Sequence, residues 1–385
     1  MVSEIPSAPA SPNGSVELPS QRTAPADANF AEYRARRTFG ALDSIRAFSI
    51  LAVIWHHAHG GVPSVAISQR GFLGVDMFFV LSGFLIVTLL LRENDRNGQI
   101  DLKKFYARRT LRIFPLYYAV IFATLAFVMV KPGSSLAGPV REELPYLLTY
   151  TSNWIHSASI LAIGWSLATE EQFYLLWPPA QKYAGRALPF LFVASLLVSQ
   201  ATNFGLLNGF FESLLGPDFA GLEILNSTFT PILLGVGLAY LLHSERSFAW
   251  LRRLAGFPGA PAVAFAALCA AGSWPVDDIS GVPRLSIQLA MTWLLATLVV
   301  REDHILRRAV RLRPIVRIGV VSYGMYLLHM FALHGARVLE GKVFGEQPLA
   351  RFALCTALTY VLAELSFRFF ESPLLRLKGR FSTAR

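Results

Sequence analysis

Charged residues are scarce in this sequence. They make up 16% of its 385 residues, whereas a typical soluble domain is about one-quarter charged. Hydrophobic residues make up 54%, and the mean hydropathy is +0.45. This balance predicts that lipid, and not water, surrounds most of the chain.

Acidic residues are the scarcer charge, with 25 Asp and Glu against 35 Lys and Arg and a net charge of +10. In a soluble chain this excess would suggest a nucleic-acid partner. Here no polar domain presents a basic surface with interleaved aromatic residues. The positive residues lie between apolar runs instead, which is typical of cytoplasmic loops. We therefore expect a membrane protein without a nucleic-acid partner.

Cysteine is nearly absent. Cys269 and Cys355 both lie inside apolar runs and form neither a metal-binding spacing nor a disulfide framework. We interpret both as small packing residues, and the sequence predicts no metal site.

The first 38 residues contain no apolar run, so they lack the core of about 7–15 apolar residues that a secretory signal needs. Their Pro, Ser and Ala content predicts a disordered cytoplasmic tail. Arg34, Arg36 and Arg37 precede the first apolar run and favour a cytoplasmic N-terminus. Residues 39–375 are then the membrane domain, and residues 376–385 are a basic cytoplasmic tail.

Within the membrane domain, ten segments approach the roughly 20 residues that span a bilayer. They lie near 41–60, 71–91, 112–131, 163–182, 187–203, 228–243, 257–272, 284–300, 317–338 and 348–371. Connections between them alternate between rich and poor in Lys and Arg, as the positive-inside rule requires. Residues 144–162 are too polar to span and are expected to re-enter or lie at the outer surface. The sequence predicts an all-α polytopic membrane helix bundle with about ten transmembrane helices and both termini cytoplasmic.

Ionisable residues in the first apolar segment are candidates for function, because a charge in the membrane costs at least a few kcal/mol. Arg46 and His57 are 11 residues apart, which on a helix is three turns plus about 20° and a rise of about 16 Å. They therefore share a face with a charge at one end and an imidazole at the other. The pantetheine arm of an acyl-CoA would bridge such a distance, and imidazole is suited to general-base catalysis. The alternative is a histidine that packs between helices.

Two further groups carry charge beside apolar runs. Glu170 and Glu171 are adjacent near the expected outer mouth, where one would orient His57 and the other would hold an acceptor; solvated helix-capping acids are the alternative. Arg109 and Arg112 are three residues apart and can face one phosphate; ordinary cytoplasmic anchoring is the alternative.

Four more residues have an open role. Asp76 follows Gly74-Val75 and is expected to be a buried polar anchor between spans. Ser322, Tyr326 and His329 share a helix face, either as a helix–helix contact or as part of a site.

These blocks together resemble the acyltransferase 3 family of membrane O-acyltransferases. Six segments occur in the family's order: Leu42 to Arg46 with His57, Gly71 to Leu85, Phe105 to Pro115, Trp165 to Tyr174, Ser322 to His329, and Glu371 to Pro373. Two departures are Met330-Phe331, where Pro often follows the late histidine, and Ser372, where Arg is common. His329 is therefore left out of the predicted catalytic set. Some relatives carry a fused extracytoplasmic hydrolase-like domain, and none is expected here.

The resemblance assigns roles to residues of this chain. It implies a catalytic set and a cofactor-binding set, with supporting residues around them. The catalytic residues are Arg46, His57, Glu170 and Glu171; the cofactor-binding residues are Arg108, Arg109 and Arg112; the supporting residues are Asp43, His56, Asp76, Trp165, Ser166 and Tyr326.

The implied reaction moves an acetyl or related acyl group, such as succinyl, from cytosolic acyl-CoA to a hydroxyl of an extracytoplasmic polysaccharide, glycan or lipid-linked sugar. The expected location is the cytoplasmic (inner) membrane, with the lipid bilayer and a glycan acceptor as partners and a homodimer left open. The alternative is a proton-coupled transporter or flippase that uses His57 and Glu170 as a relay. The sequence leaves open the acyl group, the acceptor, direct transfer or an acyl-histidine, and which glutamate partners His57.

Overall fold

The computed structural model describes residues 26–36, 38–59, 66–217, 219, 222–225, 229–343 and 347–377, in two compact units. The first unit, residues 1–37, contains α1 (Ala26–Ala35), and an ion pair of 2.9 Å joins Arg36 to Glu32 beside its end. This helix falls inside the predicted disordered tail. Residues 1–25 of that tail and residues 378–385 of the C-terminal tail lie outside the described residues.

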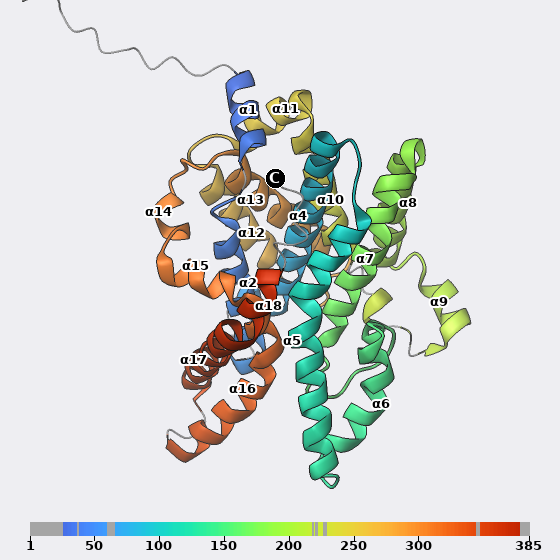
Figure 1. Ribbon diagram of the computed structural model, residues 1–385, viewed down its shortest axis with the longest axis vertical. Helices are drawn as coiled ribbons and strands as arrows, with labels where there is room; N and C mark the ends of the chain where they lie inside the picture. Colours follow the sequence, from blue (N-terminus) through green and yellow to red (C-terminus); the bar gives the residue numbers. More distant parts are fainter. Residues whose placement is uncertain are drawn as a thin grey trace, which may run out of the picture. The chain divides into compact units, whose positions relative to one another are not determined.

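The second unit, residues 38–385, is built from helices throughout its described part (Figure 1). The longer helices are α2 (Leu42–His59), α4 (Gly74–Asn97), α5 (Leu102–Val130), α6 (Ala137–Leu148), α7 (Gly164–Tyr183), α8 (Leu188–Asn203), α10 (Phe229–His243), α11 (Glu245–Ala255), α12 (Ala260–Gly272), α13 (Val282–Val300), α16 (Ser322–Val343) and α17 (Pro348–Ser366). The shorter ones are α3 (Ala66–Gln69), η1 (Gly71–Leu73), η2 (Ser152–Trp154), η3 (Gly185–Ala187), α9 (Asn208–Leu215), η5 (Glu223–Leu225), α14 (Arg307–Val310), α15 (Arg313–Val320), η6 (Phe367–Glu371) and α18 (Ser372–Arg376).

Each of the ten predicted segments contains a helix, but they differ in how well they suit a bilayer. Among the described residues, five helical stretches are long and apolar enough to cross one, and two bent pairs, α11–α12 and α15–α16, raise the number to seven. The other three predicted spans are α2 and α7, which carry the site's ionisable residues, and α10, which has 15 described residues. The chain is a polytopic helical membrane protein; the count of ten and the orientation of the termini stay predictions.

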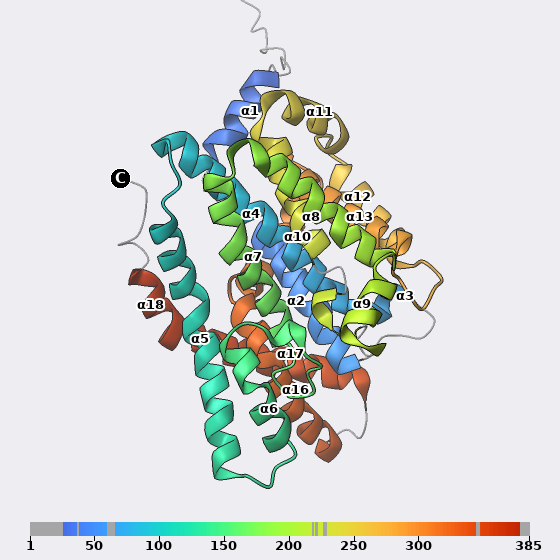
Figure 2. The same cartoon turned by 90° about the vertical axis from the view of Figure 1, so that its right-hand side faces the viewer.

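The contact between α4 and α10 is the most extensive one between helices of this unit, and the two run side by side in Figures 1 and 2. Two glycines permit it. A β-carbon on Gly83 would collide with the carbonyl oxygen of Ile232, and one on Gly235 would collide with that of Val80. Small residues allow close backbone approach, which is how helices associate in lipid, where apolar burial drives little.

Helix α2 lies among several other helices. It contacts α4, α15, α16 and α17, while α7 contacts α4 and α5 contacts α16. Helices α2, α4, α5, α7 and α16 therefore enclose a common space, and this is where the polar residues of the apolar segments meet.

Residues 144–162 form the end of α6, a turn and η2, with no helix of spanning length. Glu143 fixes this stretch, because its buried carboxylate accepts hydrogen bonds from the backbone N–H groups of Ala158 (2.7 Å) and Ser159 (2.8 Å). Tyr150 adopts φ +53°, and its ring stacks on Tyr117 at 4.4 Å. The segment is thus an ordered connection that packs on the middle of α5 and the first turns of α7, held by side chains.

Candidate active site

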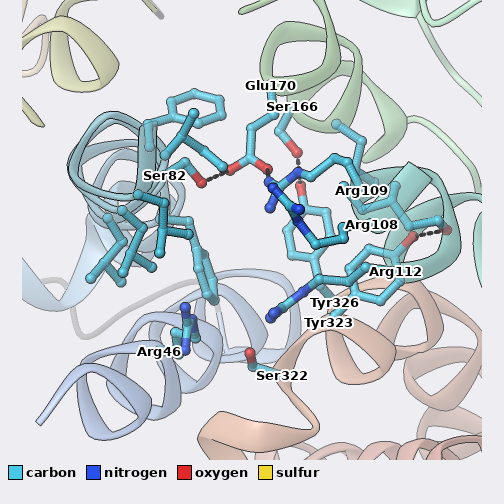
Figure 3. A pocket seen from close by; sticks show the side chains of 18 of the residues that line it. Arg46, Ser82, Arg108, Arg109, Arg112, Ser166, Glu170, Ser322, Tyr323 and Tyr326 are labelled. Carbon is cyan, nitrogen blue, oxygen red and sulfur yellow. Dashed lines mark hydrogen bonds and ion pairs between the residues drawn. The ribbon is translucent and has the colours of Figure 1, made fainter. Parts of the chain in front are cut away.

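A narrow inner cavity of about 300 Å³ lies between α2, α4, α5, α7 and α16. Its lining follows α4 from Val75 to Glu93, which is about 27 Å at 1.5 Å per residue. A cavity with so small a volume over that length must be narrow, and we therefore describe it as a channel. Figure 3 shows guanidinium groups entering it from Arg46 on α2 and from Arg108, Arg109 and Arg112 on α5.

The four arginines differ in how close a carboxylate lies to each guanidinium. Arg46 pairs with Asp43 at 2.6 Å, Arg108 with Glu93 at 3.2 Å, and Arg109 lies 4.0 Å from Glu170. In the part of the chain that the structure describes, no hydrogen bond or ion pair holds the Arg112 guanidinium, although its side chain is accessible from the cavity.

Arg109 has a second feature that matters for anion binding. Its guanidinium carbon lies 3.7 Å from the centre of the Tyr174 ring, and its buried Nε has no hydrogen-bond partner among the described residues. Stacking on an aromatic ring fixes the plane of the guanidinium while leaving its edge free for an anion. Arg109 and Arg112 are therefore the two cations best placed to receive a phosphate.

Glu170 belongs to this inner cavity. Its carboxylate accepts a hydrogen bond from the Ser82 hydroxyl at 2.6 Å (Figure 3). It also accepts one from the Tyr174 hydroxyl at 3.0 Å. Glu171 points elsewhere, since consecutive residues of a helix lie about 100° apart. Its Oε1 is buried without a hydrogen-bond partner among the described residues.

The predicted pairing of a glutamate with His57 is not present in the structure. No hydrogen bond or ion pair between described residues joins His57 to Glu170 or Glu171. The reason is depth along α7: Trp165 borders a second, outer cavity, whereas Glu170, about 7.5 Å further along the axis, borders the inner one.

His57 lines this outer cavity, which has a volume of about 850 Å³. Its Nδ1 lies 2.9 Å from the carbonyl oxygen of Val53. Because a carbonyl oxygen can only accept, Nδ1 must carry the hydrogen, and Nε2 keeps a lone pair. The backbone of α2 thus selects the tautomer of the neutral His57 ring in which Nδ1 carries the hydrogen and Nε2 is the acceptor.

His329 is a residue that the sequence interpretation left out and the structure places beside His57. The two rings are 5.0 Å apart, and the His56 ring lies 5.1 Å from that of His57. His329 is fully buried; its Nδ1 donates to the Tyr326 carbonyl at 2.6 Å, and its Nε2 has no partner among the described residues. The shared face of Ser322, Tyr326 and His329 was the available signal.

Polar and aromatic residues from several elements complete the outer cavity. Asp76 is buried and bound to Arg284 (2.8 Å) and Gln288 (3.0 Å), which ties α4 to α13 below the cavity. Trp165 and Asn208 contribute a flat ring and an amide to the lining. An aromatic face beside hydrogen-bonding groups is suited to a polar ring-shaped ligand.

One known protein family matches most of this chain in sequence. The profile of the acyltransferase 3 family, described as an acyltransferase domain, matches residues 39–366. The chain belongs to this family. The match covers both cavities and the helices around them.

Three similar proteins illustrate the family relationship. YrhL of Bacillus subtilis is 29% identical over 376 residues, which cover 91% of this chain and 56% of that protein. The peptidoglycan O-acetyltransferase OatA of Listeria monocytogenes is 29% identical over 372 residues, covering 88% and 56%. The O-acetyltransferase OatA of Staphylococcus aureus is 28% identical over 362 residues, covering 89% and 58%. The chain thus spans a little over half the length of these relatives, and no solved structure matches it.

Proposed function

We propose that this membrane protein transfers an acyl group, acetyl by default, from acyl-CoA to a hydroxyl of a cell-envelope glycan such as peptidoglycan. The observation that carries the proposal is the arrangement along α2. Arg46 faces a cationic channel, and His57, about 16 Å further along the same helix, faces a larger polar cavity.

The inner cavity suits the donor. A pantetheine arm is long and thin, as is a channel of about 300 Å³ that follows α4 for five turns. The donors for CoA phosphates are Arg112, which has no ion pair among the described residues, and the stacked Arg109. Arg108 and Glu93 mark the far end of the channel, where the nucleotide would remain.

The outer cavity suits the acceptor and the chemistry. His57 Nε2 accepts the proton of the acceptor hydroxyl, the hydroxyl oxygen attacks the thioester carbonyl, and the bond to sulfur breaks to release CoA as a thiolate, which is then protonated. A two-step route would place the acyl group on the same nitrogen first. Both routes need the neutral tautomer that the Val53 carbonyl enforces.

The test is acyl transfer by the purified protein in liposomes, supplied with acetyl-CoA and a peptidoglycan fragment. Release of free thiol and mass gain of the glycan measure the two halves of the reaction. His57→Gln should lower kcat by about 10²–10⁴-fold, the usual contribution of a general base. The KM for acetyl-CoA should stay unchanged, because the inner cavity is intact.

His334→Gln is the matched control, since His334 is exposed on α16 and lines neither cavity. It should retain full activity. Proton-gradient-dependent flux without CoA release would instead support a transporter, and full activity of the His57 variant would overturn the role of this histidine.

A further inference from the structure

The inner and outer cavities meet at two side chains. Val75 on α4 and Tyr326 on α16 line both cavities. They lie close to the inner end of the outer cavity, since Val75 is one residue before Asp76 and Tyr326 is three residues before His329. The boundary between the two spaces is therefore made of side chains, which can be altered singly.

Tyr326 is held firmly in this boundary. Its hydroxyl is 2.6 Å from the Ser166 hydroxyl and donates to the Ile163 carbonyl at 3.1 Å, so it is tied to the start of α7 (Figure 3). Its ring meets Phe78 edge to face at 6.4 Å, and 8% of the residue is exposed. A ring fixed at both its edge and its hydroxyl leaves a passage of defined width.

We propose that Val75 and Tyr326 form an acyl-size filter that restricts the donor to short acyl groups. The inference rests on the proposed function. With the phosphates at Arg109 and Arg112, the thioester must come up to this boundary to meet His57, so the acyl group occupies the space between the two side chains. Each added methylene then meets the methyl groups of Val75 or the ring of Tyr326, both of which are buried and cannot yield without a change of packing.

The two members of the filter differ in what they contribute. Val75 sets the width, because its two methyl groups project from a helix whose backbone is packed against α2 and α10. Tyr326 sets the rigidity, because its hydroxyl anchors the ring to Ser166. Removing the methyl groups of Val75 should admit a longer acyl chain. Removing the hydroxyl of Tyr326 should weaken the discrimination between acyl chains of different length.

The experiment compares acetyl-, propionyl-, butyryl- and hexanoyl-CoA as donors for the full-length protein in liposomes, measuring kcat/KM for each by thiol release and acyl-glycan mass. For Val75→Ala, the ratio of butyryl to acetyl transfer should rise about 10-fold or more, since one methylene in an apolar pocket discriminates by about 10–200-fold. Val75→Leu should lower the propionyl to acetyl ratio. Tyr326→Phe should raise the butyryl ratio by a smaller factor.

Val87→Ala is the control, because Val87 is a fully buried valine of the same helix that lines neither cavity. It should lose stability comparably and leave the donor ratios unchanged. Unchanged ratios in both Val75 variants, with acetyl transfer intact, would overturn the filter and leave the proposed function standing. Absence of thiol release from every acyl-CoA by the unmodified protein would overturn both.

Discussion

At the scale of single residues, Arg112 stands apart from the other arginines of the inner cavity. Arg46 and Arg108 each have a carboxylate within 3.2 Å, and Arg109 has Glu170 at 4.0 Å. A guanidinium without such a partner among the described residues is costly in a membrane domain. That cost is offset if an anionic ligand binds it.

Arg112→Gln should therefore raise the KM for acetyl-CoA by roughly 10–100-fold, because a hydrogen bond to a charged group contributes about 1.5–3 kcal/mol. The kcat should change little, since Arg112 is remote from His57. Steady-state kinetics and calorimetric titration with CoA measure both quantities. Arg96→Gln, an exposed arginine at the end of α4, is the control. A fall in kcat at constant KM would contradict the assignment to donor binding.

His329 leads to a second prediction at this scale. When His57 accepts the hydroxyl proton it becomes an imidazolium, and the His329 ring, 5.0 Å away, presents an Nε2 that has no hydrogen-bond partner among the described residues. His329→Asn keeps a donor to the Tyr326 carbonyl and removes this acceptor, so kcat should fall about tenfold while the KM for acetyl-CoA stays constant. The measurement is single-turnover transfer with saturating donor. Unchanged turnover would assign His329 to packing alone.

The sequence predicted which ionisable residues share a helix face better than which of them pair with one another. The spacing of Arg46 and His57 fixes their register on one helix, and the structure places them along one line of cavities. The partner of His57 could not be predicted from the sequence. Helical periodicity shows which residues of α7 share a face, but it does not show how far α7 is shifted along its axis relative to α2. A shift of about one and a half turns moves Glu170 from one cavity to the other.

At the scale of elements, the close crossing of α4 and α10 depends on two positions that have no side chain, Gly83 and Gly235. Gly83→Ala would bring a methyl group against the Ile232 backbone, which cannot move as a side chain can. We expect a loss of about 1–3 kcal/mol, the usual cost of overpacking. Thermal unfolding in detergent measures it as a lower Tm.

Gly138→Ala in α6 is the control for this substitution, because nothing lies within 4 Å of its added β-carbon. It should leave the Tm unchanged or raise it slightly, since alanine is about 0.5–1 kcal/mol better than glycine inside a helix. Equal Tm values for both variants would show that the α4–α10 contact tolerates a wider separation.

Helix boundaries were predicted less well than helix existence. The third segment was expected at 112–131, but α5 runs from Leu102 to Val130 and continues through Pro115, so all three of its cavity arginines lie on one helix. The segment at 317–338 is broken by a 79° bend between α15 and α16. No proline marks this bend; it allows Gly319 to pack against the Asp43 backbone of α2, which is a tertiary contact that local sequence does not encode.

At the scale of the whole molecule, polar helices account for two of the three predicted spans that hydropathy does not support, and the third, α10, is apolar but has only 15 described residues. Seven stretches suit a bilayer by length and composition if each bent pair counts as one. Helices α2 and α7 are less apolar because they carry Arg46, His57 and Glu170, which face cavities and not lipid. Insertion into lipid favours apolar side chains, whereas the proposed function needs charged side chains on the same helices. Contacts with α4 and α5 shield these charges.

The proposed direction of transfer requires that the arginine-rich end of the inner cavity faces the cytoplasm, where acyl-CoA is available. The basic residues Lys103 and Lys104 at the start of α5 support this side as cytoplasmic. Residues 149–162, which border the outer cavity, should then face outward. This orientation is testable without reference to activity.

Cysteine labelling tests it directly. Lys103→Cys and Ala158→Cys both place a thiol at an exposed position. In intact cells a membrane-impermeant maleimide should label the Ala158 variant, because its thiol faces outward, and should label the Lys103 variant only after permeabilisation. The unmodified chain, with Cys269 partly accessible and Cys355 buried, gives the background. The reverse pattern would place the donor channel on the outside, where no acyl-CoA reaches it, and the proposed cytosol-to-surface transfer would be excluded.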